Sequence, residues 1–427
     1  MNRRKFVQWL SASAAVGAVG GCAAPDAATR AGDGKAGRVI VIGGGYGGAT
    51  AAKYVKLWNP AIDVVLVEQN PVFISCPLSN RVLAGTMSLQ DLTRDYDTLG
   101  KHGVTVVQDV ATAIDPARRA VSLKGGQTLN YDRLIVSPGV EFLYAQLPGL
   151  NNDAAQQTIL HAWKAGPQTL ALRKQLEEMR DGGVYALFVP KAPYRCPPGP
   201  YERACQVAWY FKNAKPKSKV LVFDANPEIT SKKGLFGKAF AERYGGIIEY
   251  RPNSELTDVD PATNTARLQF EDVKADVLNV VPPQAAGAIA RQAGLVTSND
   301  RWCDVDWRTM ESTAQKNIHV LGDATLSAPA MPKSGHMANA HAKVCAAAVI
   351  AQLAEQPVND SPMMTNTCYS FISGNEVVHI ASVHAFNAEK KTMLAVEGSG
   401  GLSPAPSKLE GEYAEAWGRN IWADMLA

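Results

Sequence analysis

The stretch RVIVIGGGYGGATAAKYV, residues 38–55, decides the fold. A run of β-type apolar residues leads into Gly43-x-Gly45-x-x-Gly48, and an alanine-rich helical pattern follows. Gly43 permits a tight turn, Gly45 lets the backbone approach a pyrophosphate, and Gly48 lets helix and strand pack closely. The helix N-terminus then faces the phosphate charge. The loop offers a dinucleotide the glycines Gly43, Gly44, Gly45, Gly47 and Gly48.

A second strand supports this interpretation. IDVVLVEQN, residues 62–70, reads as a buried strand that ends in Glu68, about twenty residues past Gly48, a spacing that suits a pair of ribose hydroxyls. The alternative is a glycine-rich turn in some other α/β fold.

Two later segments favour FAD over NAD at this site. YDRLIVSPGV, residues 131–140, ends a strand in Ser137-Pro138-Gly139. NIHVLGDAT, residues 317–325, closes on Gly322 and Asp323, where a carboxylate would meet the ribityl chain. A helix then opens after Lys333, Ser334 and Gly335, and its N–H groups would face the pyrimidine edge of the flavin. This order of segments resembles that of two-dinucleotide-fold flavin disulfide reductases.

The fold class that follows is α/β: two Rossmann-like three-layer domains, one of FAD type and one of NAD type, and a C-terminal α+β interface domain. After about residue 355 the pattern changes to alternating strands, a GGLSPAPS loop expected to be flexible, and a short helix with an aromatic face. We predict a leader at residues 1–34 and an FAD domain in two parts, residues 35–150 and 286–354. The second domain is inserted between these parts at residues 151–285, and the C-terminal domain spans residues 355–427.

The second domain lacks the chemistry of a nicotinamide site. Its strand GVYALFVP leads into KAPYRCPPGPYERA, residues 191–204, which holds one glycine and four prolines. Proline has no N–H to offer a phosphate and is too rigid to wrap it. We therefore expect this domain to serve another purpose than binding NAD.

Composition excludes several classes of protein. With 46% hydrophobic and 19% charged residues in 427, and a net charge of +3, the chain reads as a globular enzyme of two or three domains. The sequence has no stripe of basic residues with interleaved aromatics, so we do not expect it to bind nucleic acid. No apolar run reaches the roughly 20 residues that a membrane span needs.

The leader indicates export. Arg3 and Arg4 precede a small-residue apolar stretch, the layout of a twin-arginine signal for periplasmic export. VGGC also fits a lipobox that would make Cys22 a lipid anchor, whereas CAAPDAA offers ordinary cleavage sites.

Six cysteines follow Cys22, and an exported protein can form disulfides among them. No C-x-x-C pair and no histidine–cysteine ligand spacing is present, so we expect no metal site, and without C-x-x-C-H the chain carries no c-type haem of its own.

Five segments together resemble the flavoprotein subunit of flavocytochrome c sulfide dehydrogenase: RCPPGPYERA, HAWKAG, PKSG, NTCYS and SCPLSN. The resemblance runs from about residue 37 to the C-terminus. It implies oxidation of hydrogen sulfide through a cysteine pair and FAD, with a c-type cytochrome subunit as partner. The chain departs from the pattern at Cys205 and Cys345, where a small inert residue is usual, and at Thr325, where a cysteine is usual.

By this resemblance Cys196 pairs with Cys368 as a redox-active disulfide. Cys196 lies just ahead of a helix start at Pro200, where the helix dipole should favour thiolate. Glu202, in the first turn, is a candidate proton acceptor for H₂S if burial raises its pKa. The alternatives are a structural disulfide or a small buried side chain for Cys196, and a carboxylate favoured by the helix start for Glu202.

Cys76 is the candidate for a covalent 8α-S-cysteinyl flavin. It follows NPVFI and precedes the polar turn PLSNRV, and in the superfamily this region crosses the dimethylbenzene ring. The alternative is a free buried thiol. Cys303, Cys345 and Cys205 are expected to be structural.

Two other functions remain open. A sulfide:quinone reductase would need an apolar quinone cleft and a membrane-binding C-terminal amphipathic helix. Five charged residues interrupt the apolar surface there: Glu410, Glu412, Glu415, Arg419 and Asp424. A non-catalytic flavoprotein scaffold for a redox partner would be indicated by loss of Cys196 or Cys368, and both are present.

Overall fold

The computed structural model describes residues 36–427, so the predicted leader, with Arg3, Arg4 and Cys22, lies outside the described residues. The first module is built on a seven-stranded sheet of order β19-β20-β21-β9-β1-β2-β5. β21, β9, β1, β2 and β5 run parallel, and β19–β20–β21 pair antiparallel. Its strands are β1 (Arg38–Ile42), β2 (Asp63–Glu68), β5 (Thr105–Gln108), β9 (Arg133–Val136), β19 (Val305–Asp306), β20 (Glu311–Ser312) and β21 (Ile318–Val320).

The centre of this sheet is fully buried, as its sequence predicts. Val39, Ile40 and Val41 have no exposed surface, because a parallel strand covered on both faces reads as a continuous apolar run. α2 (Gly48–Trp58) packs against α10 (Gly335–Leu353) beside the sheet. A three-stranded antiparallel sheet is added by β6 (Ala111–Asp115), β7 (Ala120–Leu123) and β8 (Thr128–Asn130).

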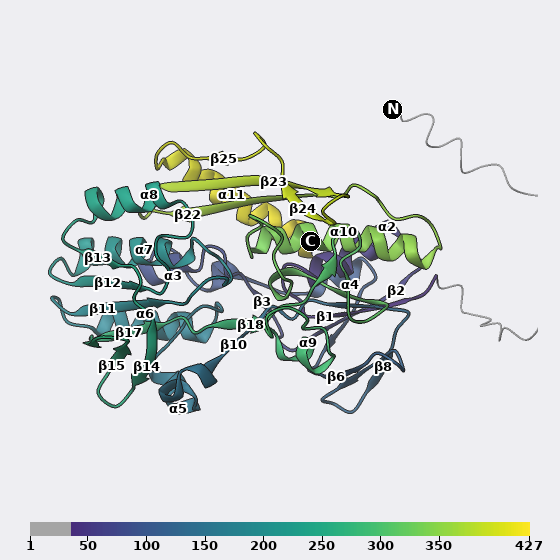
Figure 1. Ribbon diagram of the computed structural model, residues 1–427, viewed down its shortest axis with the longest axis horizontal. Helices are drawn as coiled ribbons and strands as arrows, with labels where there is room; N and C mark the ends of the chain where they lie inside the picture. Colours follow the sequence, from purple (N-terminus) through teal and green to yellow (C-terminus); the bar gives the residue numbers. More distant parts are fainter. Residues whose placement is uncertain (1–35) are drawn as a thin grey trace, which may run out of the picture. The chain divides into compact units, whose positions relative to one another are not determined.

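The second module has a four-stranded parallel sheet of order β13-β12-β11-β17. Its strands are β11 (Val184–Val189), β12 (Lys219–Asp224), β13 (Ile248–Arg251) and β17 (Val277–Val280). Its main helices are α6 (Pro167–Glu178) and α7 (Gly199–Ala214), and its antiparallel sheet contains β14 (Leu256–Asp260), β15 (Thr265–Leu268) and β16 (Asp272–Lys274). Figure 1 shows β11, β12 and β13 side by side below α7.

The C-terminal part is a long hairpin with a helix. β22 (Met363–Phe371) pairs with β23 (Val377–Asn387), which also pairs with β24 (Thr392–Ala395) and β25 (Gly401–Leu402). β22 packs against α10 of the first module and α7 of the second (Figure 1). The hairpin therefore touches both modules.

Two details of the C-terminal prediction were wrong. The helix expected to be short is α11 (Lys408–Leu426), which begins earlier because Ser407 caps it by accepting from the Glu410 N–H. The GGLSPAPS segment expected to be a flexible loop includes β25, which pairs with Ile380 and Ala381.

Shorter elements connect these parts. They are β3 (Phe73–Ile74), β4 (Thr93–Arg94), β10 (Val140–Phe142), β18 (Gln284–Ala286), α3 (Asn80–Ala84), α4 (Asp97–Lys101), α5 (Asp153–Thr158), α8 (Lys233–Lys238), α9 (Ala288–Gln292), a π-helical turn (Ala239–Arg243) and the 3₁₀ turns Gln90–Leu92, Tyr144–Gln146, Pro148–Leu150 and Gly322–Ala324. None of the helices within residues 36–427 is long and apolar enough to cross a membrane.

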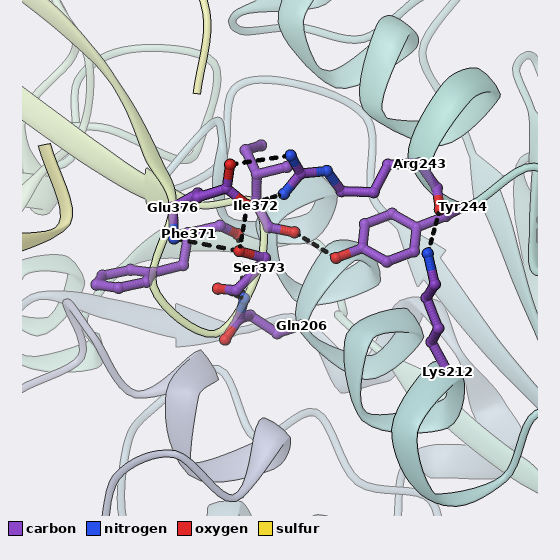
Figure 2. A network of polar contacts seen from close by, with 8 residues as sticks. All are labelled: Gln206, Lys212, Arg243, Tyr244, Phe371, Ile372, Ser373 and Glu376. Carbon is purple, nitrogen blue, oxygen red and sulfur yellow. Dashed lines mark hydrogen bonds and ion pairs between the residues drawn. The ribbon is translucent and has the colours of Figure 1, made fainter. Parts of the chain in front are cut away.

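A polar network ties the tip of the hairpin to the second module, as Figure 2 shows. The Tyr244 hydroxyl donates to the Ile372 carbonyl at 2.6 Å, and the Gln206 amide donates to the Ser373 carbonyl at 2.9 Å. Arg243 makes an ion pair with Glu376. Because these groups come from α7, the π-helical turn and the hairpin, they fix β22 against α7.

Candidate functional site

The turn between β1 and α2 has the shape of a phosphate cradle. A Cβ on Gly43, whose φ is +93°, would lie 2.3 Å from the Ser137 carbonyl oxygen, and a Cβ on Gly48 would lie 1.8 Å from the Gly43 carbonyl oxygen. A Cβ on Gly45 would meet nothing within 4 Å. Packing inside the protein thus requires glycine at positions 43 and 48, whereas Gly45 leaves room for a ligand.

Glu68 is held at this loop. Its Oε2 accepts from the Gly44 N–H at 2.6 Å, and its Oε1 accepts from the Asn70 N–H at 2.8 Å. The Tyr96 hydroxyl donates to the Gly44 carbonyl from the other side. The predicted ribose-binding carboxylate therefore lies beside the predicted phosphate loop.

The segment Ser137-Pro138-Gly139 lies against the same loop. It follows β9, the neighbour of β1 in the sheet, and the Ser137 N–H donates to the Ile42 carbonyl at 2.9 Å. A Cβ on Gly47 would lie 2.6 Å from the Ser137 hydroxyl oxygen. The structure thus brings together two of the three segments from which FAD was inferred.

The third segment supplies a carboxylate oxygen that lacks a partner. Gly322 and Asp323 form the turn after β21, and Asp323 Oδ1 is buried without a hydrogen bond. A buried unpaired oxygen costs about 1–3 kcal/mol, so a hydroxyl donor on a ligand fits there. Lys333 donates to the Asp323 carbonyl at 3.0 Å and lies 3.7 Å over the Trp302 ring, and burial lowers its pKa to about 7.

The start of α10 completes this side. Ser334 caps the helix by accepting from the Met337 N–H at 3.0 Å, and its hydroxyl donates to Asn366 of β22 at 2.6 Å. A Cβ on Gly335 would lie 2.9 Å from the Tyr46 ring of the phosphate loop. With the open space at Gly45 and the unpaired oxygen of Asp323, these residues fit an FAD.

The backbone of Cys196 is hydrogen-bonded to the segment before α10 that belongs to the predicted flavin site. Its N–H donates to the Lys333 carbonyl at 2.8 Å, and its carbonyl accepts from the Gly199 N–H at 2.9 Å at the start of α7. Its φ is +57°, a backbone conformation that is rare for a side chain with a Cβ. The backbone thus holds this thiol between the two modules.

Cys368 lies on the same side of the structure, on β22 of the C-terminal hairpin. The Asn366 amide donates to its sulfur at 3.4 Å, and Asn366 also accepts from Ser334, the residue after Lys333. Cys368 raises the pKa of Cys196. Both are half-buried free thiols in the structure. The disulfide between them stays a prediction.

The expectation that the helix dipole makes Cys196 a ready thiolate was wrong. Burial raises the pKa of Cys196 to about 12, and the neighbouring Cys368 and Glu202 add to the rise. Arg195 and Lys232 oppose it. Desolvation thus outweighs the dipole here.

Glu202 lies in the same cluster. Its Oε1 accepts from the Phe371 N–H at 2.9 Å and its Oε2 from the Asn80 amide at 3.0 Å. Burial raises its pKa, although both of these hydrogen bonds lower it. The condition set for a proton acceptor, a pKa raised by burial, is met in this structure.

Cys76 has its own polar surroundings. Its sulfur accepts from the Ala165 N–H at 3.4 Å. Burial lowers the pKa of Arg195, but Cys76, Asp323 and Cys196 together outweigh burial and raise it. The Arg195 side chain also donates to the Trp163 carbonyl at 2.6 Å. Arg195 thus connects Cys76 and Cys196.

Several site residues were missed from the sequence. Arg203, which is 2% exposed, donates from α7 to the carbonyls of His161 and Ala162 at 2.7 and 2.6 Å and to Asn80 and Asn279 at 3.0 and 2.8 Å. Arg203 and three of its four partners, His161, Ala162 and Asn80, lie in the segments RCPPGPYERA, HAWKAG and SCPLSN, so the motifs pointed to them without showing the contact. Lys232 carried no sequence signal.

The position at which an NAD-type module binds ribose is occupied internally. Asp224 ends β12 as Glu68 ends β2, and it is fully buried. Its Oδ2 accepts from the Tyr201 hydroxyl at 2.7 Å and the Tyr250 hydroxyl at 2.9 Å, and its Oδ1 accepts from the Asn226 N–H at 2.9 Å. The carboxylate is therefore satisfied by the protein's own side chains.

The other three cysteines of residues 36–427 lie in the hydrophobic core. Cys205, Cys303 and Cys345 are each fully buried, in keeping with the structural role expected of them. Among residues 36–427 no group of three or more metal-ligating side chains is close enough to hold an ion.

Comparison with known proteins identifies three matching family models. Residues 169–282 match "Sulfide dehydrogenase [flavocytochrome c] flavoprotein chain, central", and residues 360–426 match "Flavocytochrome c sulphide dehydrogenase, flavin-binding". Residues 37–174 match "Pyridine nucleotide-disulphide oxidoreductase". These matches come from both modules and from the C-terminal hairpin and helix.

Individual relatives agree. The flavocytochrome c sulfide dehydrogenase flavoprotein chain of Chlorobaculum thiosulfatiphilum is 53% identical over 45 residues, which is 10% of this chain and 94% of that sequence. The mitochondrial sulfide:quinone oxidoreductase of Mus musculus is 25% identical over 311 residues, or 67% of this chain, which spans only 65% of the mouse protein.

The fold class predicted from the sequence is confirmed by structural similarity. The sulfide:quinone oxidoreductase of Aquifex aeolicus superposes with a TM-score of 0.74 at 18% identity, over 91% of each chain.

The cradle geometry predicts the effect of one methyl group. Gly48→Ala places a Cβ against the Gly43 carbonyl oxygen, and such overpacking costs about 1–3 kcal/mol, which is about tenfold or more in flavin affinity. Flavin absorbance per purified chain should fall accordingly. Gly100→Ala is the matched control, because a Cβ there would meet nothing within 4 Å. Equal flavin content in both variants would contradict the cradle.

Proposed function

The chain belongs to the family of the flavoprotein chain of flavocytochrome c sulfide dehydrogenase, and from that premise we propose that it oxidises hydrogen sulfide and passes the electrons to a c-type cytochrome. One observation carries the proposal. The Cys196 N–H donates to the Lys333 carbonyl, and the hydroxyl of the next residue, Ser334, donates to Asn366, whose amide contacts the Cys368 sulfur. Both cysteines therefore lie at the start of α10 in the predicted flavin site. A thiol pair beside a flavin is what sulfide oxidation requires.

FAD, when bound, supplies the two-electron acceptor for this chemistry. The phosphate loop and Glu68 would hold its dinucleotide part, and Asp323 would accept a hydrogen bond from its ribityl chain. Lys333, Ser334 and Gly335 would lie at its ring end. The protein's own task is then to bring sulfide to the cysteine pair and to remove one proton from it.

Glu202 is the proposed acceptor of that proton. Its carboxylate is 7% exposed and is held by Asn80 and the Phe371 N–H. A raised pKa makes a carboxylate a stronger base once it is ionised. Glu202 lies in the first turn of α7, which begins three residues after Cys196, and its carboxylate accepts from Phe371 on β22, the strand of Cys368.

Oxidised Cys196 and Cys368 would form a disulfide in the resting enzyme. Attack by HS⁻ on one sulfur breaks this bond, forms a persulfide and releases the other cysteine as a thiolate. Arg195 lowers the pKa of Cys196, so its guanidinium favours that anion. The electrons would then pass from the cysteine pair toward the predicted flavin site, where the Lys333 carbonyl accepts from the Cys196 N–H.

A nicotinamide acceptor finds little support. The turn after β11 is rich in proline, and Asp224 is engaged by Tyr201 and Tyr250. The leader sequence, outside the described residues, favours twin-arginine export to the periplasm, with Cys22 either lipidated or removed. A c-type cytochrome is the electron carrier that the family name supplies, and the aromatic residues of α11 are a candidate contact for it.

A quinone acceptor is the second candidate, because relatives named sulfide:quinone oxidoreductase match most of this chain. A cleft of about 410 Å³ beside α11 mixes aromatic side chains with Lys343 and Asp424, which pair at 2.9 Å. Most apolar residues of α11, among them Ala414, Gly418, Ile421 and Met425, are buried, whereas Leu409 and Tyr413 near its start are exposed. Two exposed side chains do not make the continuous apolar outer face that membrane binding needs, which favours the cytochrome.

The cysteine pair gives the test of sulfide oxidation. Cys196→Ser and Cys368→Ser should each slow sulfide-dependent flavin reduction by at least about a hundredfold, because a serine cannot form the disulfide that sulfide attacks. Stopped-flow absorbance of the flavin measures it. Cys345→Ala, inside α10 and outside the cluster, should behave as wild type. Undiminished reduction in either serine variant would refute the dithiol route.

The tether gives a second test. We propose that Cys76 binds FAD covalently, since its sulfur is half-buried and contacts Ala165 and Arg195 rather than another cysteine. Acid precipitation should leave the yellow chromophore on the wild-type chain and release it from Cys76→Ser. Complete release from the wild-type chain would refute the tether while leaving FAD binding intact.

A further inference from the structure

Lys232 is a buried lysine that the proposed mechanism does not require. It precedes α8 in the second module and is 5% exposed. Its neighbour Lys233 is instead an ordinary surface lysine, with 64% of its side chain exposed and an ion pair to Glu228. A lysine is almost never fully buried unless it has a partner, so the buried ammonium of Lys232 must be stabilised by the groups around it.

The contacts of Lys232 lead to the cysteine pair. Its ammonium donates to the backbone carbonyl of Cys368 at 2.8 Å and to the Ser370 hydroxyl at 2.7 Å, both on β22. Neither acceptor carries a charge, and an ammonium has three N–H donors. The positive charge is therefore brought to the strand of Cys368 without being neutralised by these two bonds.

The backbone of Lys232 is also unfavourable for this residue type. Its φ of 55° and ψ of 37° lie in the left-handed region, which lysine rarely adopts. Its carbonyl accepts from the N–H groups of Leu235 and Phe236, both at 3.0 Å. A glycine would adopt this conformation without strain. Strain together with a buried charge at one position indicates a functional role for the side chain.

The negative charge that is present when hydrosulfide attacks the disulfide indicates what that role is. Hydrosulfide brings one negative charge into the cluster. When its sulfur attacks, the Cys196–Cys368 bond breaks, a sulfur–sulfur bond to the substrate forms, and the electron pair of the broken bond stays on the leaving cysteine. The proton of HS⁻ stays on the persulfide. One negative charge is therefore present in a half-buried site before and after the step, and burial makes such a charge costly unless a cation faces it.

We propose that the Lys232 ammonium is the built-in countercharge of the Cys196–Cys368 pair and that it makes the site bind the hydrosulfide anion in preference to neutral H₂S, whose extra proton would pass to Glu202. This inference rests on the proposed function. Lys232 acts here as a positioning residue, because its hydrogen bonds go to the backbone of Cys368 and to Ser370, and it acts on the sulfurs through space. Electrostatic coupling supports the role, since the ammonium lowers the pKa of Cys196, which burial raises.

Other charged groups also face the cluster, and each would contribute to its pH dependence. Burial lowers the pKa of Lys232, and the acidic groups around it raise it. The titratable and charged groups that face Lys232 and the two sulfurs from α7, the preceding turn, β22 and α11 are Glu202, Arg203, Arg195, Cys196, Cys368 and Glu410.

The test compares Lys232→Met with Lys233→Met in the flavin-loaded full chain. Stopped-flow flavin reduction is followed at fixed total sulfide, at pH values on both sides of the first ionisation of H₂S. In wild type and Lys233→Met the rate should rise with the hydrosulfide fraction. In Lys232→Met this rise should be lost and the rate at the alkaline end should fall by about tenfold or more. A folded Lys232→Met with the wild-type rate and pH profile would overturn the inference.

A second measurement keeps the inference separate from the proposed function. In the chemically reduced protein, the rate of iodoacetamide alkylation of Cys196 and Cys368 is measured by mass spectrometry at one near-neutral pH. Only the thiolate reacts, so loss of the cation should slow alkylation by about tenfold or more, and Lys233→Met should leave the rate unchanged. An unchanged rate in Lys232→Met overturns the countercharge. If wild-type protein is not reduced by sulfide, the proposed function fails, while the alkylation rate still decides the role of Lys232. Lys232→Gln, which keeps an N–H donor for the Cys368 carbonyl, replaces Lys232→Met if the latter does not fold.

Discussion

The guanidinium of Arg203 is buried among four neutral oxygen acceptors that come from distant parts of the chain. They belong to Asn80 in the first module, to the backbone of His161 and Ala162, and to Asn279 on β17. A buried cation that lost these bonds would cost several kcal/mol, so the first turn of α7 can dock in only one way. That turn carries Glu202 and follows directly on Cys196, and Asn80 lies close to Cys76 in the chain. The positions of Glu202, Cys196 and Cys76 therefore depend on Arg203.

The two modules put the same architecture to different uses. In the first, a glycine loop follows β1 and Glu68 ends β2, with open space at Gly45. In the second, a proline-rich turn follows β11 and Asp224 ends β12, where two tyrosine hydroxyls satisfy it. Prolines remove the N–H groups that a phosphate needs, and they fix the short path that places Cys196 against Lys333. Loss of a nucleotide site and gain of a thiol site are thus one structural change, and the hairpin of β22 supplies the second thiol.

Much of this could be predicted from the sequence, because the signals were local. The glycine spacing, the strand ending in Glu68 and the proline-rich turn are each contained in a short segment, and the structure brings the three flavin segments together as expected. Contacts between segments could not be read in this way. Arg203 binds residues 41 to 123 positions away and Lys232 binds residues 136 and 138 positions away, and nothing in their local sequence shows burial. The thiolate expected of Cys196 was wrong for the same reason: a helix dipole is a local feature, whereas desolvation is set by the whole fold.

The account requires that electrons taken from sulfide leave through a c-type cytochrome, and one experiment tests this directly. Protein whose flavin has been reduced by sulfide is mixed in a stopped-flow instrument with oxidised cytochrome c, with a soluble quinone, or with NAD⁺. The account predicts rapid reoxidation of the flavin by the cytochrome and little by the other two. Reoxidation by the quinone or by NAD⁺ while the cytochrome has no effect would contradict it.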